Sequence, residues 1–204
     1  MSWRINPLDL VNKKEAEIRV ARLMQDHPGL SKRELCDIII ARKSFWCAGS
    51  GAFTALPGII PGFGSLITLI GGTAIDIMAL MYFMAEMITE IAIVYDRDLR
   101  SRGAARETAW VYLYSIGADT VGKNISKAAV SQMGKQAFIK VAQDIMVTMG
   151  IRVSQRTILK VIPVAGALIS GTVNLFFCRR AGKTVADYYE RSRPDDWEGV
   201  TIDI

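Results

Sequence analysis

The stretch Leu56–Met78 reads LPGIIPGFGSLITLIGGTAIDIM, and the structure that it adopts decides the fold of this chain. It holds two prolines and several glycines among leucines and isoleucines, and its first charged residue is Asp76. Such a segment is typical of three structures: a membrane-inserted hairpin, a buried helix of a bundle, or a glycine-rich loop that binds phosphate.

The glycines do not follow the pattern of a nucleotide-binding loop. A dinucleotide loop requires G-x-G-x-x-G after a strand, but Gly62 and Gly64 are followed by Ile67 in the third glycine position. The segment Gly182–Thr184 has the ending of a P-loop, but Phe177 stands in place of its first glycine. The sequence therefore predicts no cofactor.

Helical patterns cover almost the whole chain. Pro7 starts an amphipathic helix that ends near His27. Ser31 and Glu34 have the spacing of a capping box, which predicts a second helix that the LPGIIPG segment ends. Pro61 is the first residue of the predicted third helix, which continues to the polar stretch at 95–103.

The last apolar run, Val161–Cys178, begins like the one after Ile60. In both, proline sets the first helical turn, and glycine three residues later allows another backbone to approach closely. We therefore predict an all-α fold, a single-domain helical bundle with two long apolar helices that start with Pro/Gly motifs. The predicted structural positions are Gly58, Pro61, Gly64, Asp76, Pro163, Gly166 and Asn174. The predicted regions are an amphipathic helix at 1–26, a helical domain at 27–193 and an acidic tail at 194–204.

Charges on the third helix form one stripe. At 100° per residue, Asp76, Glu86, Glu90 and Arg97 fall within an arc of roughly 80°. We interpret the stripe as a solvated face of a bundle helix rather than the lining of a polar channel. If Asp76 is buried, it needs a cationic partner, and the basic flanks of the last apolar run supply candidates.

Composition argues against several functional classes. The chain has 204 residues, half of them hydrophobic, and its start lacks the pattern of a signal peptide, so we expect a cytoplasmic protein. The cysteines (Cys36, Cys47 and Cys178) lack metal-site spacing and are predicted to be buried reduced thiols, with no metal bound. The one histidine, His27, lies in a predicted turn and has no second histidine to support a catalytic triad, so we expect no enzyme.

Three segments together resemble the EcsC family of bacterial proteins. They are HPGLSKRELCDIIIARK from His27, GSGAFTALPGIIPGFGSLITLIGGTAIDIMALMYFMAEMITEIAIVYDRDL from Gly49, and IPVAGALISGTVNLFFCRRAGKTVADYYE from Ile162. The positions that carry the resemblance are Gly51, Leu56, Pro57, Gly58, Asp76, Ile91, Ala92, Tyr95, Asp98, Ile162, Pro163, Gly166, Ala167 and Asn174. The resemblance implies an α-helical, membrane-associated protein and supplies no catalytic residues.

Basic residues flank both apolar runs, so headgroup attraction and acyl burial could act together. The candidate membrane contacts are Arg42, Lys43, Ile59, Ile60, Lys160, Arg179, Arg180 and Lys183. The net charge of +5 is compatible with nucleic acid, but no aromatic residues interleave the clustered cations, so we expect no nucleic-acid partner.

We expect a non-enzymatic protein that binds anionic lipids at the cytoplasmic membrane face, or a membrane protein. Two alternatives stay open: a soluble bundle that acts as a protein-interaction module, and an effector that inserts into membranes and permeabilises them. The run Val161–Cys178, at 1.5 Å per residue, is about 27 Å long, which leaves both peripheral and inserted states open. A homo-oligomer is also open.

Overall fold

The computed structural model describes residues 7–55, 67–117, 129, 132–134, 136–142, 144–145 and 163–193. Within its helices, the side chains at 50–55, 67–77, 102, 105, 163–171 and 173 lie outside this description. The described residues form helices and turns and contain no strand, which confirms the predicted all-α fold. The helices are α1 (Pro7–Leu10), α2 (Lys13–Asp26), α3 (Lys32–Ala55), α4 (Ile67–Val94), α5 (Arg102–Ser115) and α8 (Pro163–Arg191).

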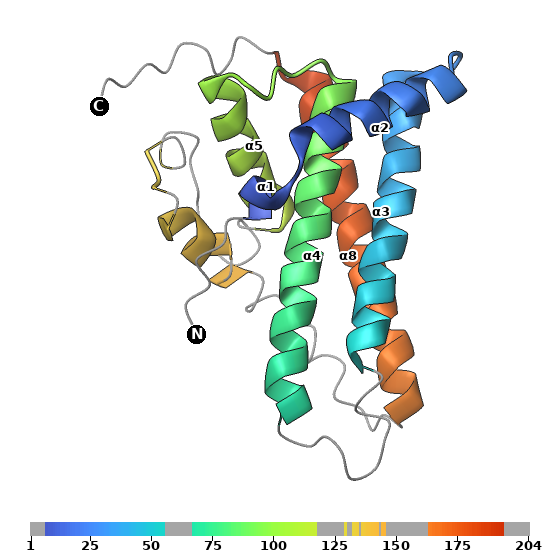
Figure 1. The fold of residues 1–204 in the computed structure, drawn as a ribbon, viewed down its shortest axis with the longest axis vertical. Helices are drawn as coiled ribbons and strands as arrows, with labels where there is room; N and C mark the ends of the chain where they lie inside the picture. Colours follow the sequence, from blue (N-terminus) through green and yellow to red (C-terminus); the bar gives the residue numbers. More distant parts are fainter. Residues whose placement is uncertain are drawn as a thin grey trace.

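Three long helices form the body of the bundle (Figure 1). Helix α3 runs antiparallel to both α4 and α8, and its most extensive contacts are with α8. Helices α1 and α2 pack against α4, while α5 packs against α4 and α8. At one end, which we call the lower end, α3 ends and α4 and α8 begin (Figure 1).

The predicted N-terminal helix is in fact two helices, α1 and α2. The Asn12 side chain accepts a hydrogen bond from the backbone N–H of Glu15 at 3.3 Å, and its amide donates to the Glu15 carboxylate at 2.9 Å. An asparagine in this position satisfies an N–H group that the first turn leaves without a partner, so a new helix begins after it. Helix α2 ends at Asp26, as predicted.

The capping box at the start of α3 is confirmed. The Ser31 N–H donates to the Glu34 carboxylate at 2.8 Å, and the Glu34 N–H donates to Ser31 Oγ at 3.3 Å. Helix α8 begins at Pro163, as predicted, and continues without a break into the basic segment. The predicted start at Pro61 lies outside the described residues, as do Gly58 and Gly64.

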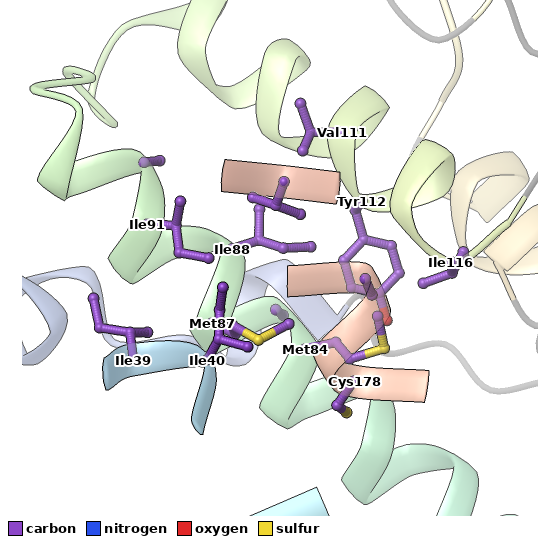
Figure 2. Packing of buried hydrophobic residues seen from close by; sticks show 14 of the residues in the cluster. Ile39, Ile40, Met84, Met87, Ile88, Ile91, Val111, Tyr112, Ile116 and Cys178 are labelled. Carbon is purple, nitrogen blue, oxygen red and sulfur yellow. The ribbon is translucent and has the colours of Figure 1, made fainter. Parts of the chain in front are cut away.

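The core joins all the packed helices, and α4 lies at its centre. Figure 2 shows Ile39 and Ile40 of α3, Val111 and Tyr112 of α5, and Ile116 directly after α5, around side chains of α4. The α4 side chains labelled there are Met84, Met87, Ile88 and Ile91, and all four are fully buried. The Tyr112 hydroxyl donates to the Met81 carbonyl at 3.2 Å, so the one polar atom of this large side chain is satisfied.

Gly182 brings α8 close to α3 and α4. A Cβ atom at this position would lie 2.7 Å from Ile40 Cγ1 and 2.9 Å from Met87 Sδ, so any side chain would displace its neighbours. The sequence predicts such a close approach at Gly166 instead, whose surroundings the structure does not describe. The close approach that the structure shows, at Gly182, lies about four helical turns further along α8.

Candidate functional site

The polar stripe of α4 is buried, so its interpretation as a solvated face is wrong. Glu86 and Glu90 are 8% and 2% exposed, and Arg97, just beyond the helix, is 6% exposed. They are covered because α2 and α3 lie over the carboxylates, while α5 and the end of α8 enclose the arginine. The side chain of Asp76, the fourth member of the stripe, lies outside the described residues.

Four side chains from three helices form a compact charge cluster: Arg19 of α2, Lys43 of α3, and Glu86 and Glu90 of α4. Arg19 donates from Nη2 to Glu86 Oε1 and from Nε to Glu90 Oε1, both at 2.7 Å. Lys43 Nζ lies 2.7 Å from Glu86 Oε2 and 3.0 Å from Glu90 Oε1. Two cations thus neutralise two carboxylates, which offsets the cost of removing the charges from water.

The charge cluster changes the protonation behaviour of the side chains around it. Burial alone lowers the pKa of Arg19, but the hydrogen bond and charge of Glu90, together with the charge of Glu86, outweigh burial and raise it. The pKa of Tyr82 is raised by burial and by the charge and hydrogen bond of Glu86. The side chains of the cluster pair with one another across three helices and form an interhelical ion-pair network.

Lys43 is therefore not available as a membrane contact, contrary to the prediction. Its side chain is 7% exposed and is held between two glutamates. The sequence groups it with Arg42 because the two cations are adjacent, but neighbouring residues on a helix point about 100° apart. Arg42 is exposed where Lys43 is buried.

A second buried ion pair joins the ends of α4, α5 and α8. Arg97 Nη2 lies 3.5 Å from Glu107 Oε1, and the two side chains are 3% and 2% exposed. The same Nη2 donates to the carbonyl and to the hydroxyl of Ser192 at 2.8 and 2.6 Å. The guanidinium lies over the ring of Tyr189 at 5.4 Å, so this pair ties the C-terminal end of α8 to the rest of the bundle.

The buried thiols are confirmed. Cys36, Cys47 and Cys178 form no disulfide and are completely buried. Burial raises the pKa of Cys36 to about 12. The hydrogen bond with Cys47, followed by burial, raises the pKa of Cys178, so both helices present protonated thiols to the core. No group of three or more possible metal-binding side chains occurs in the described part of the chain.

The other predicted membrane contacts divide into two groups. Arg42, Arg179, Arg180 and Lys183 are exposed and make no ion pair with an acidic side chain within the described ranges. Ile59, Ile60 and Lys160 lie outside those ranges. Asn174 is buried, and its amide donates to the Cys47 carbonyl at 3.4 Å, which makes it a contact between α8 and α3.

Sequence reasoning missed three exposed aromatic side chains beside these arginines. Phe45 and Trp46 on α3 are 70% and 56% exposed, and Phe176 on α8 is 71% exposed. Their signal in the sequence is the spacing i, i+3, i+4, which places Arg42 with Phe45 and Trp46 on α3, and Phe176 with Arg179 and Arg180 on α8. We call these six residues the basic–aromatic surface.

The two halves of the basic–aromatic surface lie at the same height in the bundle. Asn174 contacts the carbonyl of Cys47, which directly follows Trp46 and lies two residues from Phe45. Phe176 lies two residues after Asn174, about 200° around the helix, so the aromatic residues of the two helices lie at the level of this contact and point away from it. Large exposed aromatic side chains beside unpaired arginines are typical of interaction surfaces.

The chain matches no protein-family model, no curated protein and no solved structure. The resemblance to the EcsC family therefore stays a prediction. Over the described residues, no helix combines the length and the apolar character needed to cross a membrane.

Proposed function

We propose that the protein is a non-enzymatic, membrane-associated protein whose basic–aromatic surface binds anionic lipids at the cytoplasmic membrane face. The observation that carries the proposal is the set of three exposed aromatic side chains beside Arg42, Arg179 and Arg180. Aromatic rings favour the boundary between headgroups and acyl chains, and cations favour the anionic phosphates directly above it. The resemblance to a membrane-associated family supports the same function.

Charge and apolar contact make separable contributions to the free energy of membrane binding. Each arginine near an anionic surface contributes about 1 kcal/mol, and salt weakens this part because the screening length falls to about 3 Å at 1 M. The contribution of the aromatic rings comes from burial and is not screened. Binding should therefore require anionic lipid at low salt and be only partly reversed at high salt.

Vesicle flotation tests this proposal. Reversal of Arg42, Arg179 and Arg180 to Glu should reduce binding to phosphatidylglycerol-containing vesicles by at least about tenfold at low salt. The matched control reverses Lys14, Arg22 and Lys140, three exposed cations elsewhere in the described structure, and has the same net charge. If the two triple variants lose binding equally, net charge rather than this surface attracts the protein.

The aromatic residues need a second variant. Phe45→Ser with Phe176→Ser should remove the fraction that stays bound at about 1 M salt while leaving the circular dichroism spectrum unchanged. If the wild-type protein does not float with anionic vesicles at any salt concentration, the membrane proposal is wrong. The surface then fits the first alternative, a protein-interaction module, because exposed aromatic and arginine side chains also dominate protein–protein contacts. Dye release from the same vesicles tests the other alternative, permeabilisation.

A further inference from the structure

The register of α3 against α8 is fixed by two contacts far apart in the bundle. Arg33 forms an ion pair with Asp187 near the end opposite the lower end, which we call the upper end (Figure 1). Asn174 donates to the Cys47 carbonyl farther down. Because the helices are antiparallel, both contacts give the same register to within one residue, so each residue of α3 can be matched to the α8 residue at its level.

Exposed charges on this pair of helices change sign along the bundle. At the upper end, Arg33 faces two carboxylates of α8, Asp187 and Glu190, and Asp37 adds a third one turn lower on α3. From the level of Asp37 downward, α8 has exposed cations that pair with no acidic side chain of the described ranges: Arg179, Arg180 and Lys183. The charged residues of α8 follow one another at intervals of three or four positions, which places them on one side of the helix. The α3–α8 face is therefore acidic at its upper end and basic lower down.

A face with this charge order is complementary to a second copy of itself. A two-fold axis that lies in the plane of the face and crosses both helices inverts the second copy, so that each α8 lies antiparallel to α8 of the other copy. We place this axis at the level of Val185. Lys183 then lies opposite Asp187 of the second copy, because the two are equally far from Val185 in the sequence. For the same reason, Arg180 lies opposite Glu190 of the second copy.

The same axis also matches charges on α3. Because the Arg33–Asp187 ion pair sets the register, the axis crosses α3 at the level of Leu35. Asp37 of one copy then lies opposite Arg33 of the other. A single axis position thus brings three kinds of opposite-charge pair together, each of them twice, and this is the electrostatic complementarity that a specific contact between two copies needs.

We propose that two copies of the protein associate through the α3–α8 face and that the dimer covers Arg179 and Arg180 of the basic–aromatic surface. This inference rests on the proposed function and adds its regulation, since anionic lipid and the second copy compete for the same arginines. The contact, from 177 to 193 on α8, is about 24 Å long and about 20 Å wide across two helices, so each copy buries about 500 Å². A total of about 1,000 Å² is typical of a transient dimer, and its charge pairs should make it sensitive to salt.

Reversal of one charge pair tests the dimer. Arg180→Glu and Glu190→Arg each place like charges opposite one another twice, so each variant should dimerise at least about tenfold more weakly than the wild type. An equimolar mixture of the two variants should dimerise again, because both pairs of the mixed dimer join opposite charges. Lys140→Glu makes the same charge change as Arg180→Glu at an exposed site elsewhere and should leave the dimer intact. Sedimentation velocity of the full-length proteins at low salt measures all of these. The fold should tolerate Glu190→Arg, since Asp187 still pairs with Arg33.

Vesicle flotation tests the regulation. Glu190→Arg weakens the dimer and keeps Arg179 and Arg180, so at protein concentrations at which the wild type is dimeric it should bind phosphatidylglycerol-containing vesicles several-fold better. Glu17→Arg makes the same charge change on α2, where the side chain is 41% exposed, and should not show this gain. An equal gain in both variants would mean that net charge raises the binding, and it would overturn the regulation.

The sedimentation result decides the dimer independently of lipid. A wild type that stays monomeric at every concentration, single variants that dimerise as well as the wild type, or a mixture that stays monomeric would each overturn the inference while leaving the proposed function intact. Failure of both the wild type and Glu190→Arg to float with anionic vesicles would instead remove the proposed function and the regulation with it.

Discussion

Arg42 and Lys43 are neighbours in the chain with opposite surroundings. Arg42 is exposed on the basic–aromatic surface, whereas Lys43 is 6% exposed and paired with Glu86 and Glu90. Arg42 can contact a binding partner, whereas Lys43 stabilises the fold. A pair of adjacent cations thus gives a matched comparison between a binding residue and a structural one.

Removal of Lys43 should destabilise the protein strongly. In a Lys43→Met variant, two buried carboxylates share only Arg19, and breaking a buried ion pair in this way costs about 3 kcal/mol or more of unfolding free energy. An Arg42→Met variant should unfold within about 0.5 kcal/mol of the wild type, because surface substitutions rarely cost more. Urea unfolding measures both, and equal stability of the two variants would contradict the buried charge cluster.

At the scale of the helices, the capping box at the start of α3 is a charged contact at an exposed site. The hydrogen bonds from the Ser31 hydroxyl and from its backbone N–H lower the pKa of Glu34 below the ordinary 4.5. A lowered folded-state pKa means that the stabilisation is present above the unfolded-state pKa and is lost as the pH falls through the folded-state value.

A Glu34→Gln variant should therefore show a lower melting temperature than the wild type at pH 7, and the difference should shrink below about pH 4.5. Glutamine keeps the shape of the side chain and can still accept from Ser31, so the comparison isolates the charge. Thermal unfolding followed by circular dichroism between pH 3 and pH 7 gives the result. A difference that grows on acidification would show that the carboxylate does not act through this cap.

The contact of α8 with α3 and α4 depends on a glycine. A Gly182→Ala variant places a methyl group 2.7 Å from Ile40 Cγ1 and should cost about 1–3 kcal/mol, because the side chains of two helices must move. The control is Gly49→Ala, where nothing lies within 4 Å and where alanine should stabilise α3 by up to about 1 kcal/mol. We expect the two variants to change the unfolding free energy, measured in urea, with opposite signs. Stabilisation by Gly182→Ala would mean that the helices are not closely packed there.

At the scale of the whole molecule, the sequence predicts the elements better than their contacts. The C-terminal end of α2, the start of α3 and the start of α8 follow from local signals, such as the Ser31–Glu34 pair and Pro163. The break at Asn12 was missed because the apolar residues on both sides fit one continuous helical stripe. Caps and prolines can be recognised in a sequence. A cap is hardest to recognise where the apolar pattern of a helix continues on both sides of it.

Burial of the charge cluster could not be read from the sequence for a different reason. Lys43 and Glu86 are 43 residues apart, and Arg19 and Glu90 are 71 apart. A stripe of charges at helical spacing looks the same whether it faces water or two cations on neighbouring helices. Only the packing of α2 and α3 over α4 decides between these environments. The exposed aromatic residues were missed for the same reason, because their exposure also depends on how the helices pack.

The ion pairs of Arg19 bear on whether the N-terminal region can be removed from the protein. Although the sequence sets residues 1–26 apart as an amphipathic helix, α2 supplies one of the two cations that neutralise Glu86 and Glu90 in the interior. Its buried side chains, Ala16, Val20 and Leu23, belong to the same core. Truncation at His27 would therefore leave an uncompensated negative charge on the central helix together with an open apolar face. We therefore expect the segment to fold and unfold together with the bundle, and an expression fragment that omits it to aggregate.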